Sequence, residues 1–518
     1  MAFEVLKHYW PHLVSLSALL CALVTSCHVL LNKRDSRSAT GWLGMIWFTP
    51  FLGSTLYVLL GINRIRRKAH LARHRRTPPN FNPTDLAALP LATRPLPLSP
   101  LPVSPLSVSP LAVSPLAVTP PTASLSSASP WVSLKQLGNR MSPYQLCMPN
   151  VIEPLDGPEK ALTAMLEAIF HAQKSILLLT YIFDRSGIGR DFLAALEKAK
   201  KKGLSIRVLI DAIGARTSFP TAARDLRRMG IRVALYRPVS LPLRLTYFNL
   251  RNHRKAMIVD DVLAFTGGMN IRCSKHVLLR DLHFRITGPL VRQIQHAFYD
   301  DWFDTTQESL PLPPLGNNLR PPGASQQLSS ATHGENAGEA RVILDGPDEN
   351  FERHRLMVLG ALACAKKSVK IVTPYLLPDS NLISALSVTA LRGVMVTVII
   401  PETSNLRLVQ WACMGTLWQI LEHGVEVFLS APPFDHTKLM IVDDCWSYFG
   451  SANWDMRSFR LNFELNVECY DPQLAQKLLA LFCERLTGAR RLLAQELSQR
   501  PWLIQLRDAT ARLALPYL

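Results

Sequence analysis

The sequence predicts an α/β protein in which an N-terminal transmembrane helical hairpin precedes two α/β/α sandwich units packed about a pseudo-twofold axis. Three observations lead to this fold class. Two long apolar runs, residues 13–31 and 42–62, stand near the N-terminus. The segment Leu-Asp-Gly-Pro occurs twice, at residues 155–158 and 344–347, and each copy opens the same succession of helices and strands. The predicted strands are nearly continuous apolar runs, which is typical of a largely parallel sheet covered by helices on both faces.

Each apolar run is long enough to cross a membrane. They hold 19 and 21 residues, and about 20 helical residues span a hydrocarbon core of roughly 30 Å. A cleaved signal peptide is one alternative for the first run, but no small-x-small cleavage site follows it and the second run begins shortly afterwards. Two buried core helices are the other alternative. Aromatic residues stand near the ends of the runs, as they often do at membrane interfaces, so we expect a spanning hairpin.

The charge of the chain indicates an anionic partner. The 518 residues include 57 Lys and Arg against 39 Asp and Glu, a net charge of +18, and 48% of the residues are hydrophobic. This composition excludes a purely disordered chain and is compatible with a nucleic acid, a membrane surface or a phosphorylated substrate. Residues 1–80 hold 11 basic and 2 acidic residues, so half of the net charge lies beside the apolar runs. The nucleic-acid interpretation loses half its support.

Basic residues also predict the orientation of the hairpin. Seven Lys and Arg lie within residues 64–76, directly after the second apolar run. The loop between the runs carries only Lys33, Arg34 and Arg37. By the positive-inside rule, we expect the large C-terminal part to face the cytoplasm.

Two stretches rich in proline and small polar residues divide the chain. The first contains a five-residue repeat of Ser-Pro and Thr-Pro pairs. Dense proline removes backbone donors and blocks helices and central strands, so we expect an extended tether. A docking site for a proline-binding module is the alternative. The expected order is a membrane hairpin over 5–76, a linker over 77–133, a first unit over 134–310, a linker over 311–340, and a second unit with C-terminal helices over 341–518.

Each predicted unit contains the pattern His-x-Lys-x(4)-Asp, followed ten residues later by Asn. Every member of the second copy stands 183 positions after its counterpart in the first. The pairs are His253 and His436, Lys255 and Lys438, Asp260 and Asp443, and Asn270 and Asn453. Because residues i and i+2 of a strand point to the same face, each His projects together with its Lys. About a twofold axis, two imidazoles and two ammonium groups would converge on one anion.

This combination suits phosphoryl transfer without a metal. One imidazole attacks phosphorus to form a phosphohistidine, the other protonates the leaving alkoxide, and the Lys and Asn side chains stabilise the oxyanions. The two roles need opposite protonation states, which imidazole supplies near neutral pH because its ordinary pKa is about 6.5. The nine cysteines are scattered and never spaced as C-x-x-C, which argues against a zinc cluster and gives no sign of a disulfide framework. We therefore expect neither a metal nor a cofactor.

A carboxylate is expected to orient each imidazole through its second ring nitrogen. Asp281 lies 28 residues after His253, and Glu464 lies 28 residues after His436, so these two carboxylates are the predicted orienting groups.

The remaining polar residues of the motifs have other predicted roles. Asp260 and Asp443 belong to the catalytic motif, but each stands five residues beyond its Lys, at an expected strand end. Hydrogen bonding within the fold is their favoured role. The candidates for contact with phosphate are Asn270, Asn453, Ser451 and Thr266.

The duplicated motif resembles that of the phospholipase D superfamily, whose H-x-K-x(4)-D signature both copies match in full. The resemblance narrows to bacterial cardiolipin synthases and covers residues 5–76 and 145–490. It rests also on residues 249–255, 280–283, 288–289, 373–375 and 457–464, and on Gly41-Trp42, Pro50, Gly53, Tyr57 and residues 61–64 near the N-terminus. The chain departs from the family in its long proline repeat, in Asp435 directly before the second His, and in Thr180 before Tyr181. None of these departures changes a predicted catalytic residue.

The resemblance implies a two-step transfer between lipids. A phosphatidyl group passes from phosphatidylglycerol to an active-site His with release of glycerol, and then to a hydroxyl group of a second phosphatidylglycerol. Within the superfamily the first motif supplies the nucleophile, which implies His253 as nucleophile and His436 as acid and base, although the internal symmetry leaves this order open. The implied partners are phosphatidylglycerol, other anionic phospholipids and the membrane, without nucleic acid. The implied location is the bacterial cytoplasmic membrane, crossed by two helices.

Other functions remain as alternatives. A phospholipase D-type hydrolase would form the same phosphohistidine and resolve it with water, whereas closure against a bilayer excludes water and favours an alcohol. A transferase using another lipid, such as phosphatidylethanolamine, would need the same residues. A superfamily nuclease is disfavoured by the two apolar runs, and a non-enzymatic membrane scaffold by the completeness of both motifs.

Overall fold

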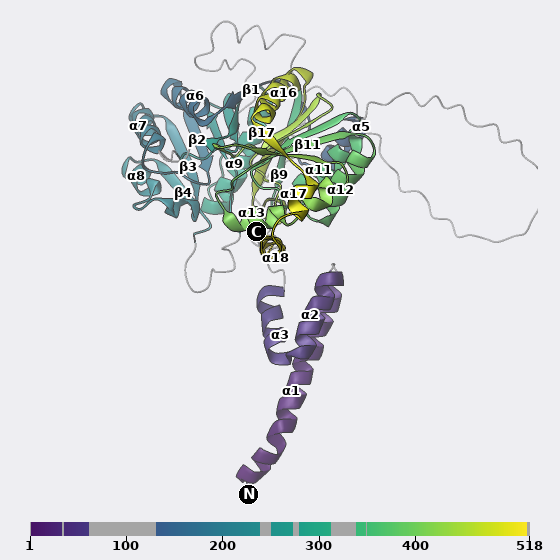
Figure 1. Ribbon diagram of the computed structural model, residues 1–518. Helices are drawn as coiled ribbons and strands as arrows, with labels where there is room; N and C mark the ends of the chain where they lie inside the picture. Colours follow the sequence, from purple (N-terminus) through teal and green to yellow (C-terminus); the bar gives the residue numbers. More distant parts are fainter. Residues whose placement is uncertain are drawn as a thin grey trace, which may run out of the picture. The chain divides into compact units, whose positions relative to one another are not determined.

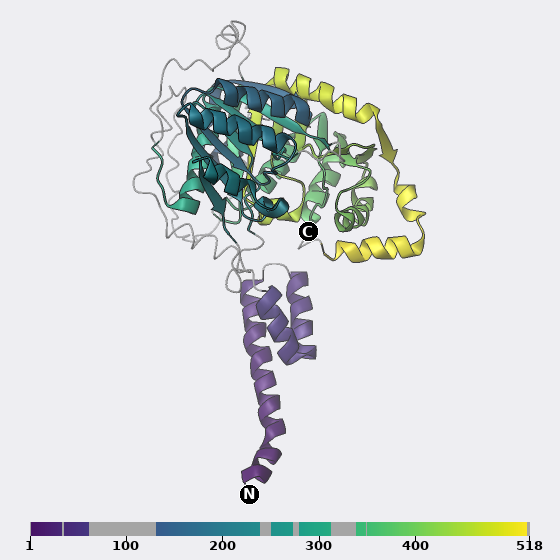
Figure 2. The ribbon, with the colours of Figure 1, turned by 90° about the vertical axis from the view of Figure 1, so that its left-hand side faces the viewer.

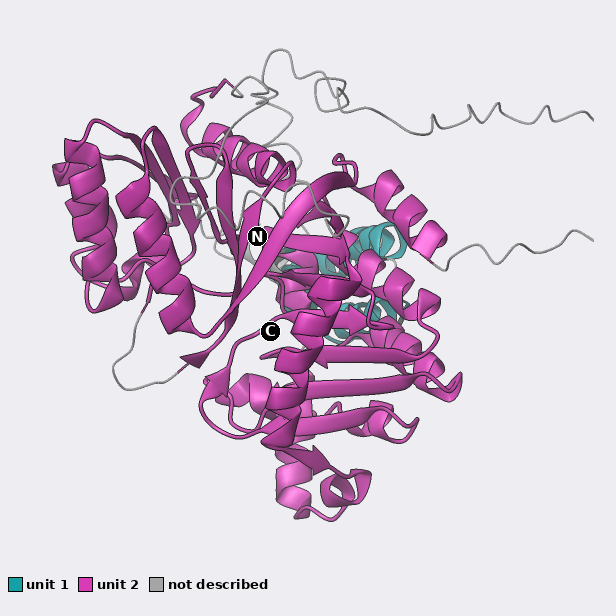
Figure 3. Cartoon of the chain, turned by 90° about the horizontal axis from the view of Figure 1, so that it is seen from above, with its two compact units in different colours: residues 1–74 teal, residues 75–518 magenta. Residues whose placement is uncertain are grey.

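The structure is a computed structural model that describes residues 2–33, 36–61, 131–238, 250–272, 279–311, 338–348 and 350–514. The chain forms two compact units, residues 1–74 and 75–518, which Figure 3 shows in different colours. Nearly all of the two predicted linkers lies outside the described residues. At their described ends, helix α5 begins at Trp131 and strand β9 begins at Gly338, slightly earlier than the predicted boundaries.

The described residues of the N-terminal unit form one long helix and two short ones (Figure 1). Helix α1 covers Ala2–Asn32, α2 covers Ser36–Phe48, α3 covers Pro50–Leu56, and a π-helical turn, η1, covers Tyr57–Gly61. Residues His12–Asn32 of α1 are long and apolar enough to cross a membrane, which agrees with the first predicted span. No other helix in the described part of the chain has that length and apolarity.

The second predicted span does not form one helix. Thr49 has φ −139° and ψ 75°, a non-helical conformation, as expected for a residue before proline, and it separates α2 from α3. A Cβ atom on Gly61 would lie 3.1 Å from Cε2 of Trp42. In a continuous helix, residues 42 and 61 would be about 28 Å apart. The chain therefore reverses at the Thr49–Pro50 step, and the prediction of a second spanning helix over residues 42–62 is not confirmed.

The returning segment packs along α1. The hydroxyl groups of Thr25 and Ser54 are 3.0 Å apart, and His28 Nδ1 lies 2.8 Å from the Tyr57 hydroxyl. Residue numbers rise together in these two contacts, so α3 and η1 run in the same direction as α1. Gly61 consequently lies toward the same end of the unit as Asn32.

The large unit is built on a mixed sheet. Fifteen of its described strands are joined in the order β17-β12-β11-β10-β14-β15-β16-β9-β1-β8-β6-β5-β2-β3-β4. We call β1 to α9 the first half and β9 to β17 the second half. From the central β1–β9 pair outward, each half has four further strands in antiparallel pairing and then two in parallel pairing. The second half ends with one more strand, β17, which pairs antiparallel with β12. The mixed sheet confirms the predicted α/β class. The expectation of a largely parallel sheet is wrong, because parallel pairing is confined to β2–β3–β4 and β10–β11–β12 and all other pairs of the large sheet are antiparallel.

The strands have the following bounds. In the first half they are β1 (Cys147–Asp156), β2 (Ser175–Thr180), β3 (Ser205–Asp211), β4 (Arg232–Tyr236), β5 (Ala256–Val259), β6 (Leu263–Gly267), β7 (Leu279–Arg280) and β8 (Leu282–Thr287). In the second half they are β9 (Gly338–Asp345), β10 (Ser368–Val372), β11 (Met395–Pro401), β12 (Glu426–Ser430), β13 (Phe434–Asp435), β14 (Leu439–Val442), β15 (Trp446–Gly450), β16 (Glu464–Tyr470) and β17 (Ala489–Leu492). The short strands β7 and β13 pair with each other outside the large sheet.

Helices cover both faces of the sheet. Helices α9 and α16 pack on the face whose apolar core both halves share, and the other named helices of the two halves pack mainly on the opposite face. The helices are α5 (Trp131–Met141), α6 (Pro158–His171), α7 (Ile188–Lys201), α8 (Ala222–Arg228), α9 (Leu290–Thr306), α11 (Arg353–Cys364), α12 (Ser380–Leu391), α13 (Arg407–Met414), α14 (Trp418–Leu421), α15 (Met456–Arg460), α16 (Pro472–Thr487), α17 (Ala494–Ser498) and α18 (Trp502–Arg512), with a 3₁₀ turn, η3, at Gly214–Thr217. Figure 2 shows the C-terminal elements in yellow along the edge of this unit.

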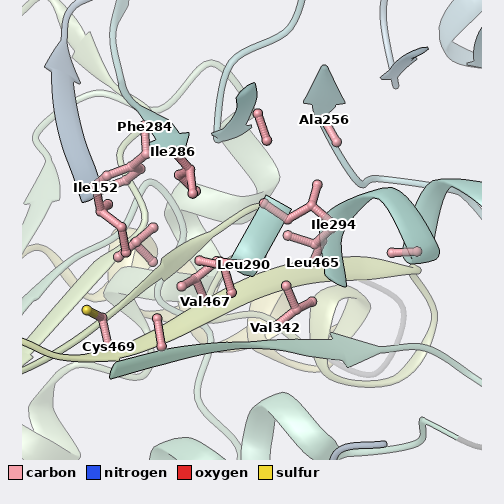
Figure 4. Packing of buried hydrophobic residues seen from close by; sticks show 14 of the residues in the cluster. Ile152, Ala256, Phe284, Ile286, Leu290, Ile294, Val342, Leu465, Val467 and Cys469 are labelled. Atoms are coloured by element: carbon pink, nitrogen blue, oxygen red, sulfur yellow. The ribbon is translucent and has the colours of Figure 1, made fainter. Parts of the chain in front are cut away.

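Successive strand residues alternate between the two apolar layers. Leu177 of β2 belongs to the core shared by both halves, and its neighbour Leu178 packs against the helices of the opposite face. Figure 4 shows the shared core, where Val467 of β16 in the second half lies beside Leu290 of α9 in the first. Because both layers are apolar, the strands read as nearly continuous apolar runs in the sequence.

Helix α5 packs on the second half although it precedes the first half in sequence. Leu134 lies in the apolar core around α11 and α12. Arg341 of β9 donates to the backbone oxygen of Lys135 at 3.0 Å. By packing, residues 131–141 therefore join the second half, whereas the sequence analysis places residues 134–141 in the first.

Candidate active site

The segment that carries His253 pairs with the backbone of the second half. Asn252 forms an isolated parallel bridge with Phe463, and the amide of His253 donates to the Phe463 oxygen at 2.9 Å. The next residue after Phe463 is Glu464, the first residue of β16. This backbone pairing brings a carboxylate of the second half beside the imidazole of the first.

The segment that carries His436 makes the reciprocal pairing. Strand β13 pairs in parallel with β7, and the amide of His436 donates to the Arg280 oxygen at 2.7 Å. Asp281 follows Arg280 directly. The two motif segments therefore each find their partner in the opposite half.

The two predicted carboxylates do contact the two imidazoles, but the partners are exchanged. His253 Nδ1 lies 3.0 and 3.1 Å from the two oxygens of Glu464, and His436 Nδ1 lies 2.9 Å from Asp281 Oδ2. The equal spacing of 28 residues named the two carboxylates without saying which imidazole each would orient, and in the structure each contacts the His of the opposite half. Spacing within one copy does not reveal an exchange that depends on how the two copies pair.

These contacts orient both rings in the same way. A carboxylate on Nδ1 holds the ring hydrogen on that nitrogen and leaves the lone pair of Nε2 for chemistry. The side chains of His253 and His436 are 14% and 17% exposed, so each is mostly buried and still open on one side. The rings of Tyr181 and Tyr375 stand edge-on to them, with centroids 5.2 and 6.3 Å away.

The two motif lysines lie beside the histidines. Lys255 Nζ donates to the backbone oxygen of His253 at 2.6 Å, and Lys438 Nζ lies 2.7 Å from His436 Nδ1. Both lysine side chains are buried. Among the described residues, no group of three or more His, Cys, Asp and Glu side chains is arranged to hold a metal ion. The arrangement offers buried positive charge to an anion.

Burial lowers the pKa of all four basic groups and is the largest cause in each case. It lowers the pKa of Lys255 to about 7 and that of Lys438 to about 8. The charges of Lys438 and Lys255 act with burial to lower the pKa of His436 to about 4. The pKa of His253 is lowered by burial and by both ammonium groups, while Glu464 opposes them. Since each imidazole is affected by the lysine of the other copy, the two motifs form one site.

Glu464 is held by more donors than Asp281. The side chains of Ser451, Ser458 and Asn462 donate to Glu464 at 2.5, 3.0 and 3.2 Å, whereas Asp281 accepts from the amide of Leu282 at 2.8 Å. Burial by itself raises the pKa of Glu464, but the charge of His253 and the surrounding donors lower it to about 2. The hydroxyl group of Ser451, a predicted phosphate contact, therefore serves the carboxylate.

The other predicted phosphate contacts also have partners within the protein. Asn270 Oδ1 accepts from the amide of Ile182 at 3.1 Å, and Asn453 Nδ2 donates to Asp455 at 3.2 Å. The hydroxyl group of Thr266 donates to the backbone oxygen of Lys255 at 2.8 Å. These contacts brace the segments around each motif.

Asp260 and Asp443 lie at the far ends of the strands that follow the histidines. Asp260, after β5, accepts from the amides of residues 173–175, and Asp443, after β14, accepts from the amides of residues 366–368, all at 2.7 to 2.9 Å. Both have positive φ, 54° and 51°, in tight turns. Each carboxylate fastens a turn to the start of the neighbouring strand, which is the role that their expected position at strand ends favoured.

Sequence reasoning missed the buried groups that hold the residues before His253. Asp211, at the end of β3, accepts from the amide of Asn252 at 2.9 Å and pairs with Arg251 at 3.2 Å. The Asn252 side chain donates to Asp301 of α9 at 2.8 Å. A carboxylate directly after the apolar residues of a buried strand, as Asp211 is, was the available signal.

In the second half, the residue before the His is held by a basic side chain instead of an acidic one. Asp435, one of the departures from the family pattern, accepts from Arg485 Nε of α16 at 2.9 Å. Arg485 also forms an ion pair with Asp156 of the first half. Asp435 therefore takes part in a buried ion-pair network that joins the two halves directly beside His436.

A family model described as "Cardiolipin synthase, PLD-like domain" matches residues 165–302 and 358–486, which include both His-x-Lys motifs. This chain belongs to the cardiolipin synthase family. The match confirms the resemblance to cardiolipin synthases of the phospholipase D superfamily that the motifs suggested.

The relatives match along most of the chain. It is 31% identical over 391 residues to a cardiolipin synthase of Geobacillus sp. (strain WCH70), covering 74% of this chain and 76% of that protein. It is 30% identical over 528 residues to the major cardiolipin synthase ClsA of Bacillus subtilis (strain 168), covering 98% and 100%. The crystal structure of a phosphatidylserine synthase from Haemophilus influenzae Rd KW20 has the same fold, with a TM-score of 0.57, 17% identity, and coverage of 74% of this chain and 100% of that one.

The pH dependence of kcat/KM should report the charge of Lys255. Because its pKa is lowered to about 7, its charge is present below that pH and is lost as the pH rises through it, which weakens binding of an anionic substrate. Arginine keeps its charge across this range, so Lys255→Arg should move the alkaline limb of the profile to higher pH. Lys370→Arg, at a lysine paired with Asp444, is the matched control. An alkaline limb that stays in place in Lys255→Arg would contradict this assignment.

Removing Asp443 should reduce stability rather than chemistry. Asp443→Ala leaves three backbone amides without their acceptor, and we expect a loss of about 1–3 kcal/mol, measured as a lower Tm in detergent. Asp444→Ala, at the neighbouring carboxylate, should have a smaller effect. Turnover per folded molecule should persist in both variants; its loss in Asp443→Ala at an unchanged Tm would place Asp443 in the chemistry.

Proposed function

We propose that this protein transfers a phosphatidyl group from one phosphatidylglycerol to a hydroxyl group of a second and releases glycerol, forming cardiolipin. The observation that carries the proposal is the exchanged pairing of two imidazoles with two buried carboxylates, with a lysine beside each imidazole. The chemistry of that set suits a phosphodiester, since it supplies a nucleophile, an acid and positive charge. The relatives named cardiolipin synthase support phosphatidylglycerol and other phospholipids as the substrate class.

In the first step, Nε2 of His253 attacks phosphorus and forms a P–N bond. The P–O bond to the glycerol headgroup breaks, and His436 gives its proton to the departing oxygen. His436 has a pKa lowered to about 4, so it is neutral at pH 7 while no anion is present. The negative charge of the phosphodiester offsets the ammonium groups of Lys255 and Lys438, which favours protonation of His436 in the complex.

In the second step, the glycerol hydroxyl group of another phosphatidylglycerol attacks the phosphatidyl-histidine. His436, now neutral, takes the proton of that hydroxyl group. The P–N bond breaks, His253 is restored and cardiolipin leaves. Lys255, Lys438, Asn270 and Asn453 are proposed to stabilise the oxygens of phosphorus in both steps.

The unequal surroundings of the two imidazoles support this order. Both oxygens of Glu464 face His253, and three side-chain donors fix that carboxylate. A rigidly held neutral ring suits a nucleophile. His436 Nδ1 faces the ammonium group of Lys438 as well as Asp281, which makes a protonated His436 the stronger acid.

We also propose that residues 134–310 and 341–518 are two phospholipase D-type units related by a pseudo-twofold axis. The repeated strand order on either side of the β1–β9 pair supports this arrangement, as does the constant offset of the motifs. Residues 77–133 and 311–340 are proposed as linkers, and residues 5–76 as the membrane segment. Helix α5 packs as part of the second half.

For the membrane, we propose that α1 crosses alone and that α2 and α3 enter and leave on one side. Helix α2 has 13 residues and is about 20 Å long, too short for a hydrocarbon core of roughly 30 Å. The reversal at Pro50 brings Gly61 toward the end of the unit where Asn32 lies. We therefore assign the sequence that follows each of these two residues, with three basic residues in 33–37 and seven in 64–76, to one side of the membrane. Lys7 stays on the other side. This distribution satisfies the positive-inside rule with the catalytic part in the cytoplasm.

Cysteine labelling distinguishes this topology from a spanning hairpin. In spheroplasts, a membrane-impermeant maleimide should label Glu4→Cys, whereas Ser38→Cys should react only after the membrane is permeabilised. A hairpin that crosses twice would reverse this pattern. The native exposed Cys483 marks the side of the catalytic part and should react together with Ser38→Cys.

The proposed reaction is tested with the purified full chain in detergent and labelled phosphatidylglycerol. We expect cardiolipin and glycerol in equal amounts, with loss of more than a hundredfold in turnover for His253→Ala and for His436→Ala. Formation of phosphatidic acid alone at every lipid concentration would identify a hydrolase instead.

The order of the histidines is tested with a phosphatidyl nitrophenyl ester, whose leaving group needs no acid. His436→Ala should then release one burst of nitrophenol per site and trap the phosphatidyl group on His253, whereas His253→Ala should give no burst. The opposite result would reverse the two roles.

A further inference from the structure

Helix α18 exposes an apolar stripe on the catalytic unit. Trp502, Leu503 and Leu506 are 70%, 61% and 55% exposed, and Leu513, directly after the helix, is 76% exposed. At 3.6 residues per turn these four side chains fall on one side of the helix. The buried residues Asp508 and Ala511 lie on another side. Such a separation of faces is typical of a helix that packs on its protein and offers a second apolar face to another partner.

The buried side of α18 packs against α13, as Figure 1 shows. A Cβ atom on Gly415, at the end of α13, would lie 2.6 Å from the backbone oxygen of Asp508. The guanidinium group of Arg507 stands 4.7 Å from the centroid of a Trp411 ring. The two helices are therefore one packed element, and α18 is firmly placed on the catalytic unit.

The start of α13 carries exposed leucines as well. Leu406 is 50% exposed and Leu408 is 44% exposed. Together with the α18 residues they make a set that we call the docking face: Leu406, Leu408, Trp502, Leu503, Leu506 and Leu513.

The α13 end of the docking face lies near the active site. The Tyr375 hydroxyl group donates to Asn405 Oδ1 at 2.6 Å, and the Tyr375 ring lies edge-on to His436. Leu406 follows Asn405 directly. One side chain, Tyr375, therefore links the second imidazole to the first leucine of the docking face.

Basic residues accompany the docking face. Residues 489–514 contain five Arg against Glu496 and Asp508. The side chains of Arg490, Arg491 and Arg507 are about half exposed, at 52%, 55% and 42%, and each also pairs with a carboxylate, of Glu496, Glu426 and Asp508 respectively. An exposed Trp and several Leu beside arginines are the composition of helices that lie in the interface of an anionic membrane.

We propose that the docking face rests on the surface of an anionic phospholipid bilayer, with Trp502 and the leucines at the boundary between headgroups and acyl chains. This inference rests on the proposed function, because phosphatidylglycerol keeps its acyl chains in that bilayer while its phosphodiester reaches the histidines. The occupant is lipid because the apolar stripe and the arginines match acyl chains and anionic headgroups together. Docking holds the His436 side of the site against the surface from which both substrates come.

The proposal is tested by comparing one enzyme on two forms of its substrate. The full chain is reconstituted in phosphatidylcholine vesicles, either with long-chain phosphatidylglycerol in the bilayer or with dihexanoyl phosphatidylglycerol added below its critical micelle concentration. Leu503→Glu combined with Leu506→Glu should lower kcat/KM at least tenfold on the bilayer substrate and less than twofold on the soluble one. The matched control is Val388→Glu with Leu391→Glu on α12, whose side chains are similarly exposed, and it should leave both values unchanged. Equal losses on both substrates, or no loss on either, would overturn the proposal.

A second measurement does not depend on turnover. An environment-sensitive fluorophore is attached to Leu503→Cys, and the signal from the native cysteines is measured on the parent chain and subtracted. The emission of the fluorophore should shift to the blue in vesicles containing phosphatidylglycerol and should be quenched by nitroxides near the lipid headgroups. The same label on Leu391→Cys should do neither. If the reaction fails while this quenching is seen, the proposed function is wrong and the docking face stands. A protected label in detergent together with a dimeric mass that Leu503→Glu abolishes would assign the face to a second copy of the chain instead.

Discussion

The exchange of carboxylates between the two halves is the constraint on which the active site depends. Glu464 is fully buried, and its ionised form is stabilised by His253 of the other half and by donors of its own half. Leaving a buried carboxylate without its partner costs several kcal/mol. Neither half contains a complete His–carboxylate pair, so the site is complete only when the two halves pack together. The backbone pairing of each His segment with the opposite half reinforces that coupling.

Around this shared frame the two halves differ in charge. The residue before His253 is Asn252, held by Asp301 of α9, whereas the residue before His436 is Asp435, held by Arg485 of α16. An acidic side chain of α9 and a basic side chain of α16 thus each fix one His segment to a helix that packs on the sheet. The carboxylates differ as well, since Glu464 has three side-chain donors around it. These differences give two geometrically equivalent imidazoles unequal electrostatic surroundings, which a reaction needs when one must attack and the other must donate a proton.

Four physically distinct features suit a membrane or an anionic lipid. Helix α1 supplies a span of membrane length. The short helices α2 and α3 bury apolar surface against α1. The docking face is an exposed apolar stripe on the catalytic unit. Buried lysines with lowered pKa values provide positive charge inside the protein for the phosphodiester. Half of the net charge that first indicated an anionic partner therefore belongs to residues 1–80, which include the apolar N-terminal runs. Two further positive charges, those of Lys255 and Lys438, lie beside the active-site imidazoles.

The sequence by itself determined the α/β class and the chemical groups of the site, because these are written in local patterns. Apolar residues that continue along a strand indicate a sheet covered on both faces, and a motif repeated at a constant offset singles out its members, including Asp281 and Glu464 at equal spacing. Only the tertiary structure decided which carboxylate serves which imidazole, because that pairing joins residues from opposite halves. The same holds for the packing of α5 on the second half. Hydropathy did not predict the reversal at Pro50, because proline is tolerated in spanning helices and an apolar run is compatible with one spanning helix or with two helices folded back on each other. The contact between Gly61 and Trp42 forms only after the chain has turned.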